Sequence, residues 1–362
     1  MPDFIIIGGG LLGMLTAREL VSAGHTVTLL EQGRMGRESS WAGGGIVSPL
    51  YPWRYADCIT ELASWGQQHY PSLAQALEEE SGIDPEYCRN GLLMLEPEDL
   101  DAALRWRSKT PQPVEQLSPP AIAACEPALG TNAETAVWMP DVGQVRNPRL
   151  VKACYGAIEH RVEIHPQTQV SRLLTSQGRL IGVETPQRKF SADRVIVCAG
   201  AWSGNLLQPY LPSPQIEPVM GQMILFRSQP DAIQRIVLHQ DRYVIPRRDG
   251  RILVGSTLEY QGFQKQTTQA ARDALATFAL EHFPILHQAE IEHHWAGLRP
   301  GSPQGIPYIG PVPGIDGLFI NAGHFRNGVV LSPASARLLA DLVLGRTPIL
   351  SPSSYAVTSP RE

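Results

Sequence analysis

The chain has few cysteines for its length, and they are scattered. Five occur among 362 residues, at positions 58, 88, 125, 154 and 198, and no two of them form a C-x-x-C pair. A disulfide framework would need an even and regularly spaced set, and a structural zinc site would need grouped thiolates. We therefore expect free thiols in a reducing compartment and no metal site.

The sequence also lacks a long apolar run and an excess of basic residues. It opens on a short apolar stretch followed by glycines, without the basic and apolar regions of a signal peptide or the run of about 20 apolar residues that crosses a membrane. Lysine and arginine total 30 against 35 acidic residues, which gives a net charge of −5 and no bulk basic surface for nucleic acid. A cytoplasmic protein that binds neither membranes nor nucleic acids is the expectation.

The first 31 residues follow a pattern of strand, glycine turn, helix and second strand. Residues 4–7 and 26–30 are short apolar runs typical of buried parallel strands. Residues 12–20 carry apolar side chains at helical spacing between those runs. With 43% hydrophobic residues in the whole chain, we expect one large domain or two closely joined domains.

The turn between the first strand and the helix has the form G-x-G-x-x-G, and an acid ends the second strand. Such glycines allow a tight turn, close approach to a pyrophosphate and close packing of the helix on the strand. The helix N-terminus attracts the phosphates, and the acid accepts hydrogen bonds from ribose hydroxyls and disfavours a 2′-phosphate. The pattern predicts dinucleotide binding, against the alternative of a turn that serves packing alone. The expected binding residues are Gly8, Gly10, Leu11, Leu12, Gly13, Glu31 and Gln32.

Two further small-residue segments indicate a cofactor longer than a nicotinamide dinucleotide. Three consecutive glycines at 43–45 follow soon after the ribose acid, and a buried strand at 194–198 runs into small residues. Close backbone approach in several places suits a flavin, which extends through the protein, whereas the alternative is a flexible surface loop. The expected contacts are Ser39, Ser40, Ala42, Gly43, Gly44, Ala199, Gly200 and Trp202.

Helix signals appear at several other places along the chain. Residues 59–79 predict one or two helices, interrupted at a proline. Asn147 is the expected N-cap of a helix over 148–159, and Ser332 is the expected N-cap of a last helix over 333–344. From position 212 onward the pattern changes to antiparallel strands and hairpins.

Three segments read together resemble the FAD-dependent D-amino-acid oxidase superfamily and, within it, the glycine oxidases. The first is the opening unit, which continues as GHTVTLLEQG at 24–33. The second is WAGLRPG at 295–301 followed by PYIG at 307–310, and the third is AGHFRNG at 322–328. The segment DVGQV at 141–145 also looks like the family. The resemblance covers nearly the whole chain.

The resemblance implies an α/β fold with two domains. A Rossmann-like FAD-binding domain would be discontinuous, over residues 1–80, 140–212 and 310–362. A substrate domain with a mixed or antiparallel sheet and helices would cover residues 81–139 and 213–309. The expected assembly is a homo-oligomer.

The resemblance also implies the reaction. Glycine, or a small primary or secondary amino acid such as sarcosine or a small D-amino acid, would be oxidised by hydride transfer to flavin N5. The imino acid would hydrolyse to a 2-oxo acid and ammonia, and O₂ would reoxidise the flavin with release of H₂O₂. Glycine oxidases often serve thiamine biosynthesis. Sarcosine oxidase relatives attach FAD to a cysteine in the C-terminal part of the chain, but no cysteine follows Cys198 here, so noncovalent FAD is expected.

Three residues are expected to act on the substrate. An amino-acid carboxylate needs a rigid arginine fork, and Arg299 follows an apolar strand and precedes a proline. In family members this arginine binds the substrate carboxylate, and the hydroxyl of Tyr243 would donate to the same carboxylate. The alternatives are that Arg299 lies on the surface and that Tyr243 serves packing. Arg326 would contact the substrate or close the site. The resemblance adds to the FAD contacts Val170, His324, Phe325, Arg326, Asn327 and Gly328.

His324 is tempting as a general base, but hydride transfer requires only a neutral amine and correct alignment, so we expect a structural role for it. Residues 325–331 precede or open the last helix, whose positive end would stabilise charge on reduced flavin. Asp241 and Leu258 depart from residues found in some glycine oxidases. Other small amine substrates, a quinone-dependent D-amino-acid dehydrogenase, and a non-catalytic binding protein of the GDP-dissociation-inhibitor type are the alternative functions.

Overall fold

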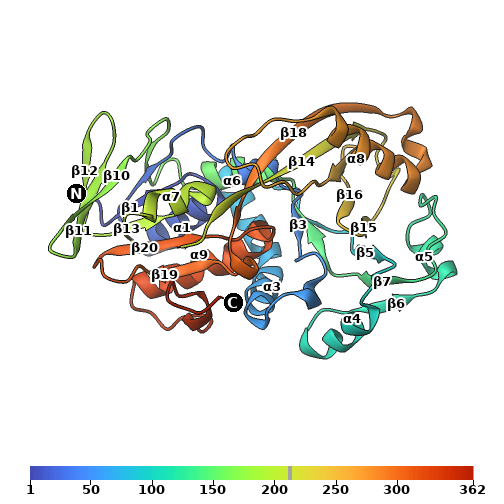
Figure 1. Ribbon diagram of the computed structural model, residues 1–362, viewed down its shortest axis with the longest axis horizontal. Helices are drawn as coiled ribbons and strands as arrows, with labels where there is room; N and C mark the ends of the chain where they lie inside the picture. Colours follow the sequence, from blue (N-terminus) through green and yellow to red (C-terminus); the bar gives the residue numbers. More distant parts are fainter. Residues whose placement is uncertain (211–213, 362) are drawn as a thin grey trace.

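The computed structural model describes residues 1–210 and 214–361, so the expected domain boundary at 212 and 213 lies outside the described residues. Strands β1, β13 and β20 lie toward one end of the molecule and β5, β6 and β7 toward the other (Figure 1). The helices are α1 (Leu11–Ser22), α2 (Ser39–Ala42), α3 (Asp57–Ser81), α4 (Leu100–Trp106), α5 (Pro119–Cys125), α6 (Asn147–Gly156), α7 (Ser203–Leu207), α8 (Gln269–His282) and α9 (Gly328–Val343).

A six-stranded sheet forms the end of the molecule that holds the N-terminus. Its order is β19 (Tyr308–Pro311), β20 (Leu318–Ala322), β13 (Val195–Val197), β1 (Phe4–Ile7), β2 (Val27–Leu30) and β9 (Glu163–His165). All neighbours are parallel except β19, which runs antiparallel to β20. The predicted strand, turn, helix and strand unit is therefore present.

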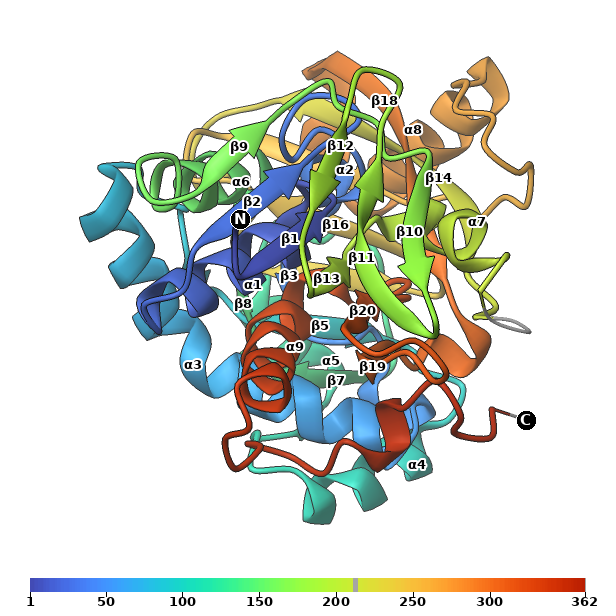
Figure 2. The ribbon, with the colours of Figure 1, turned by 90° about the vertical axis from the view of Figure 1, so that its left-hand side faces the viewer.

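Both faces of this sheet are covered, which explains why its strands are apolar throughout. Phe4 and Ile6 pack in one cluster with residues of α1, α3, α6 and α9. Ile5 and Ile7 pack on the opposite face, against α7 and the small sheet of β10 (Arg172–Ser176), β11 (Arg179–Glu184) and β12 (Lys189–Ser191). Figure 2 shows this small sheet in front of β1 and β13.

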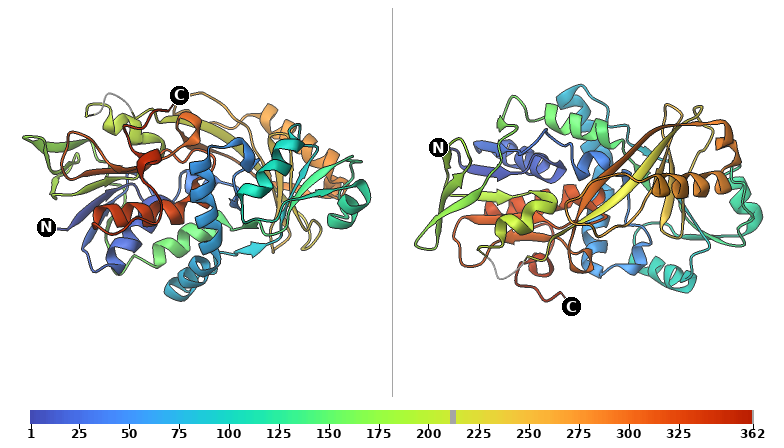
Figure 3. Two further views of the ribbon diagram at one scale, coloured as in Figure 1. Left: turned by 90° about the horizontal axis from the view of Figure 1, so that it is seen from below. Right: turned by 45° about the horizontal axis from the view of Figure 1, so that its top comes forward.

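An eight-stranded sheet forms the other end. Its order is β18 (Glu290–Gly301), β14 (Glu217–Arg227), β17 (Arg251–Gly255), β16 (Arg242–Pro246), β15 (Ile236–His239), β5 (Leu92–Leu95), β7 (Ala136–Met139) and β6 (Glu115–Leu117). Within this sheet, the β15–β5 pair is the one parallel pair among the described strands. Helix α8 packs on one face (Figure 3), and the other face packs against α4 and the segment around Tyr51. A short sheet of β3 (Ile46–Val47), β8 (Gly143–Gln144) and β4 (Cys88–Arg89) lies between the two.

The last helix begins earlier than predicted. Helix α9 starts at Gly328 and contains Pro333, whereas the sequence suggested a cap at Ser332. Proline 333 cannot donate to the carbonyl of Val329, four residues before it. That carbonyl accepts instead from the Ser332 hydroxyl at 2.8 Å and from the Tyr70 hydroxyl at 3.2 Å. These replacement bonds allow the helix to continue through the proline.

Two other helix predictions need correction or refinement. Asn147 is not an N-cap, because α6 begins at that residue and its cap position is Arg146. The Asn147 amide instead donates to the carbonyl of Ser40 at 2.7 Å. The segment predicted as one or two helices is the single helix α3, which contains Pro71. Packing on α6 and α9 along its length outweighs the missing hydrogen bond.

Candidate functional site

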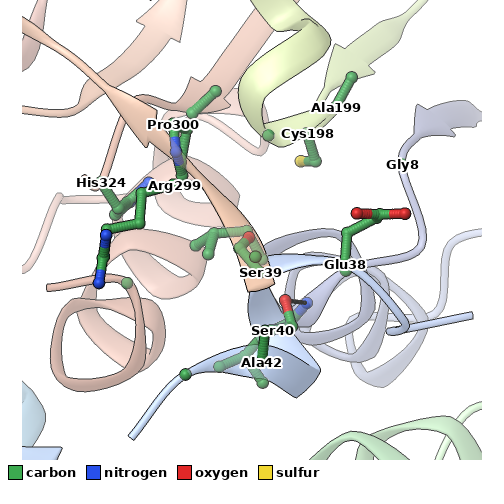
Figure 4. Close-up of a pocket in the computed structure, with 18 of the residues that line it drawn as sticks. Gly8, Glu38, Ser39, Ser40, Ala42, Cys198, Ala199, Arg299, Pro300 and His324 are labelled. Atoms are coloured by element: carbon green, nitrogen blue, oxygen red, sulfur yellow. Dashed lines mark hydrogen bonds between the residues drawn. The ribbon is translucent and has the colours of Figure 1, made fainter. Parts of the chain in front are cut away.

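A cavity of about 520 Å³ lies at the carboxyl ends of the parallel strands. It is lined by residues from the ends of β1, β2, β13 and β20 on one side and from β14, β16 and β18 on the other. Ligands of open α/β sheets bind outside the carboxyl ends of the strands. Figure 4 shows Arg299 and His324 on one side of this pocket and Gly8 and Glu38 on the other.

The glycine turn is packed too closely for side chains. A Cβ on Gly13 would lie 1.9 Å from the carbonyl oxygen of Gly8, which shows that this glycine lets α1 approach β1. A Cβ on Gly8 would lie 2.3 Å from the carbonyl oxygen of Cys198. The turn after β13 therefore lies beside the first glycine turn, as the sequence suggested. Leu11 N–H donates to the Ser40 hydroxyl at 2.9 Å, which joins the α2 segment to the same helix end.

Glu31 is held in a fixed orientation at the end of β2. Its carboxylate accepts from the Gly9 N–H and from the Gly33 N–H, each at 2.7 Å. Burial raises its pKa above the usual value, and these two hydrogen bonds act in the opposite direction. Each carboxylate oxygen has acceptor capacity left for a ribose hydroxyl.

The triple-glycine loop packs between the start of α6 and β18. A Cβ on Gly45 would lie 2.0 Å from the Val145 carbonyl oxygen, and one on Gly297 would lie 2.5 Å from the Cβ of Ala42. The Trp295 indole N–H donates to the Ala42 carbonyl at 3.1 Å. These contacts pack the loop into the wall of the cavity.

Arg247 fixes the same loop from behind, and sequence reasoning missed it. Its guanidinium is buried and donates to the carbonyls of Gly44 at 2.7 Å and Val145 at 3.0 Å, and to the side chain of Gln144. Burial lowers its pKa to about 10. It follows a hairpin strand and precedes another arginine, so no local pattern distinguishes it from a surface residue.

Arg299 and Tyr243 lie together on the side of the cavity formed by β14, β16 and β18. The Arg299 guanidinium donates to the Ser256 hydroxyl at 2.8 Å and to the carbonyls of Met220 and Thr257 at 3.3 Å. Burial lowers the pKa of Arg299, and the neighbouring Tyr243 counteracts that shift. A Cβ on Gly44 would lie 3.3 Å from the Tyr243 hydroxyl, so the glycine loop reaches the same point.

The third recognised segment is tied to the second by main-chain contacts. Phe325 N–H donates to the Pro300 carbonyl at 2.9 Å, and the Ser302 hydroxyl donates to the Gly323 carbonyl at 2.5 Å. Phe325 has a φ of 43°, which is uncommon for a residue with a side chain. The segments that carry the family resemblance therefore meet around one cavity.

The surroundings of His324 fit the expected structural role. Its ring is buried, and Nε2 lies 2.9 Å from the Ser335 hydroxyl of α9. Burial lowers its pKa from the usual 6.5 to about 3, so the ring stays neutral at physiological pH. Its contact with Ser335 ties the ring to α9.

Because of His324, we expect the free energy of unfolding to decrease as the pH falls. Between pH 6.5 and about 3, the unfolded chain binds a proton at this ring and the folded chain does not, so stability decreases as pH decreases. From pH 7 to pH 5 the loss amounts to about 2 kcal/mol. The variant His324→Gln, measured by urea unfolding of the holoenzyme at both pH values, should lose about 2 kcal/mol less than the wild type. Equal losses would contradict the assignment.

Most predicted site residues line the cavity. These are Gly8, Gly10, Leu11, Leu12, Glu31, Gln32, Ser39, Ser40, Ala42, Gly43, Gly44, Val170, Ala199, Gly200, Trp202, Tyr243, Arg299, His324, Phe325, Arg326 and Gly328. Gly13 lies behind the lining because it packs the helix on the strand, and Asn327 also lies outside it.

Other lining residues were not predicted. They include Glu38, Thr168, Cys198, Asn205, Gly221, Met223, Gly297, Pro300 and Asn321. Gly297 and Pro300 belong to the recognised WAGLRPG segment, whose pattern could have identified them. Gly221 lies within a strand whose sequence carries no signal of a binding site. A Cβ on Gly221 would lie 2.2 Å from Arg299 Nη1, so the glycine makes room for that guanidinium.

Known proteins resemble this chain in sequence and in fold. The family model described as FAD dependent oxidoreductase matches residues 3–342. The glycine oxidase of Pseudomonas aeruginosa is 50% identical over 97% of this chain and 97% of its own length. The bifunctional protein ThiO/ThiG of Synechocystis sp. is 32% identical over 99% of this chain, which spans 54% of that protein. The solved glycine oxidase of Geobacillus kaustophilus has a TM-score of 0.93 at 29% identity and covers 99% of this chain and 98% of its own.

Proposed function

The chain belongs to the family of FAD-dependent oxidoreductases, and on this premise we propose that it oxidises glycine and small amino acids such as sarcosine, with O₂ as electron acceptor. The predicted resemblance, the α/β fold class, the FAD cofactor and the broader class of FAD-dependent amino-acid oxidase are confirmed. The observation that supports the proposed substrate is the rigid Arg299 beside Tyr243 in the cavity that the dinucleotide turn also lines.

The residues around the cavity fit FAD. Close packing leaves bare backbone at Gly8 and Gly45, and Glu31 is oriented at the strand end where a ribose would lie. The side-chain oxygen of Asn321, a buried lining residue, has no hydrogen-bond partner among residues 1–210 and 214–361. Glycines and Glu31 would hold the adenosine diphosphate half, and residues near Arg299 and Phe325 would border the reacting half.

Noncovalent binding remains our proposal for the cofactor. Cys198 lines the cavity, and burial raises the pKa of its thiol to about 12. A protonated thiol is a poor nucleophile, which argues against a covalent link at this position.

Each of three side chains has a proposed role. Arg299 binds the substrate carboxylate through the donors that it does not use on the protein, and Tyr243 donates its hydroxyl to the same carboxylate. Arg326 contributes positive charge at the same end of the cavity. Bound FAD would supply the acceptor for the α-hydrogen, transferred as a hydride, and the route by which the electrons reach O₂. The chain itself aligns the amino acid, so no protein base is required.

An aerobic peroxide assay over glycine, sarcosine, D-alanine and D-proline tests the proposal. We expect H₂O₂ with glycine and sarcosine and a 2-oxo acid as second product. Absence of peroxide with every one of these substrates would reject oxidase action on this set. Reduction of a quinone without peroxide would favour the dehydrogenase alternative, and colourless purified protein would favour the non-catalytic one.

The domain boundaries, the assembly, the cellular location and the pathway role are also part of the proposal. We assign residues 1–80, 140–212 and 310–362 to the FAD-binding domain and residues 81–139 and 213–309 to the substrate domain, in keeping with the two large sheets. A homo-oligomer, a cytoplasmic location and a role in thiamine biosynthesis are also proposed. Among the described residues, no helix has both the length and the apolar character of a bilayer span.

A further inference from the structure

Arg247 is a buried arginine that joins the end of β16 to the triple-glycine loop. It directly follows β16, whose second residue is Tyr243, and it is 9% exposed. Its Nη2 donates to the Gly44 carbonyl at 2.7 Å, and its Nη1 donates to the Val145 carbonyl at 3.0 Å and to the side chain of Gln144. The guanidinium thus connects the strand that carries Tyr243 to a loop 203 residues earlier in the chain.

The three acceptors of Arg247 are all uncharged. Glu86, a carboxylate whose charge is felt at Arg247, pairs instead with Arg146 at 3.3 Å and with Arg149 at 3.2 Å. A buried charge without an ion partner destabilises a fold, and an apolar side chain of similar size would avoid that cost. The presence of a charge here therefore points to a role that depends on the direction of its hydrogen bonds.

The main chain of Gly44 lies directly against the ring of Tyr243. A Cβ added to Gly44 would lie 3.1 Å from Tyr243 Cε2, 3.3 Å from the Tyr243 hydroxyl and 3.0 Å from Ile245 Cδ1. Tyr243 and Ile245 both belong to β16, and Gly44 and Tyr243 line the cavity together. The hydrogen bond from Arg247 to the Gly44 carbonyl therefore sets how closely the loop approaches the tyrosine that is proposed to bind substrate.

Gln144 holds Arg247 in this conformation. Its side-chain oxygen accepts from Arg247, while its amide nitrogen donates to the Pro246 carbonyl at 2.8 Å and to the Asn90 side chain at 3.1 Å. Gln144 is 2% exposed, so water does not compete for these hydrogen bonds. It belongs to the DVGQV segment at 141–145, and this contact gives that segment a function beside the cavity.

We propose that Arg247, oriented by Gln144, is a positioning residue that holds Gly44 against Tyr243 and thereby aligns the amino acid for oxidation. This inference rests on the proposed function, because it concerns the same substrate and the same C–H bond. Hydride transfer depends steeply on alignment, and a displacement of about 1 Å can slow a reaction about 10²-fold. The planar guanidinium directs its donors to two fixed carbonyls, which an ammonium on a flexible chain does not reproduce.

Anaerobic reduction of bound FAD by glycine tests this role. Arg247→Lys keeps the positive charge but lacks the planar fork, and its rate is normalised to bound FAD. We expect the limiting rate of flavin reduction to fall at least tenfold. Glycine deuterated at the α-carbon should give an isotope effect at least as large as in the wild type, because breakage of the C–H bond is the step that slows.

Substrate binding should change much less than the rate. The glycine concentration that gives half of the limiting rate should shift less than threefold, because the hydrogen bonds that hold Arg299 do not involve Arg247. Acetate carries the carboxylate of glycine but has no amine to be oxidised. Its Kd, measured from the change that it causes in the flavin absorption spectrum, should also stay within threefold of the wild-type value.

Two further variants complete the test. Gln144→Met removes the side chain that orients Arg247 and should slow flavin reduction at least threefold. It decides the question by the same measurement if Arg247→Lys does not yield folded holoenzyme. Arg361→Lys makes the matched substitution at an arginine that donates to the Pro307 carbonyl, at 2.9 Å, instead of to the glycine loop, and it should leave the limiting rate unchanged.

The outcomes separate alignment from stability. A limiting rate per bound FAD that is unchanged in both Arg247→Lys and Gln144→Met would overturn the inference, even with a lower Tm, because the two side chains would then serve stability alone. A wild type whose FAD is reduced by neither glycine nor sarcosine would instead reject the proposed function, and this inference with it.

Discussion

Replacement of Arg299 by alanine is expected to raise KM for glycine so that kcat/KM falls about 10²- to 10³-fold, while FAD stays bound. Loss of one partner of a buried, hydrogen-bonded charge pair costs about 2–5 kcal/mol, and about 1.4 kcal/mol corresponds to a factor of ten. The flavin is expected to remain because the glycine turn and Glu31 lie on the other side of the cavity. Steady-state kinetics with the visible flavin spectrum provide the measurement.

A lysine variant separates charge from geometry at this position. Arg299→Lys keeps the positive charge but lacks the planar fork that pairs with a carboxylate through two hydrogen bonds. The kcat/KM of this variant for glycine should lie between the values of the wild type and of the alanine variant. Unchanged kinetics in Arg299→Ala would refute the carboxylate role. Loss of FAD from that variant would show that the arginine supports the cofactor site as well.

Replacement of Gly13 by alanine is expected to yield protein largely without FAD. The added Cβ would lie 1.9 Å from the Gly8 carbonyl oxygen, a main-chain atom that cannot move without distorting the phosphate-binding turn. Overpacking of this kind costs about 1–3 kcal/mol or more. We expect at least tenfold weaker FAD binding and a lower Tm, measured by flavin content after gel filtration and by thermal unfolding.

Gly33→Ala is the matched control for this change. Its Cβ would lie 3.5 Å from Glu31 Oε1, an ordinary van der Waals contact, and the Gly33 N–H that bonds Glu31 is retained. This variant should keep normal FAD content. If both variants bind FAD equally well, close helix–strand packing at Gly13 is not needed for the cofactor.

The sequence was informative where the physical constraint is local. The opening strand, turn and helix are set by hydrophobic spacing and by glycines within one short segment, and β1, α1 and β2 appear where predicted. The recognised segments around Arg299 and Phe325 also converge, because the main-chain contacts between them follow from the shared fold. About half of the cavity-lining residues could thus be named from the sequence.

The remaining features depend on contacts between distant parts of the chain. Arg247 bonds to Gly44 across 203 residues, and Asn147 bonds to Ser40 across 107, so neither role leaves a local signal. Asn147 before a proline has the form of an N-cap, and its tertiary partner overrides that preference. Likewise, the hydroxyl of Tyr70 that helps α9 pass through Pro333 lies 259 residues from the carbonyl it serves.

The long pairing of β14 with β18 has a consequence for motion during turnover. Its ladder runs from the Glu217–Gly301 pair to the Arg227–Glu290 pair, with one register shift between Leu225 and Phe226. One part of β18 contacts the glycine loop through Trp295, and its other end meets Phe325 through Pro300. Hinge bending between the two halves of the molecule would have to break these contacts of β18 with the glycine loop and with Phe325. We therefore expect the substrate to enter through side-chain movement at the cavity mouth, with the two halves remaining at a fixed distance.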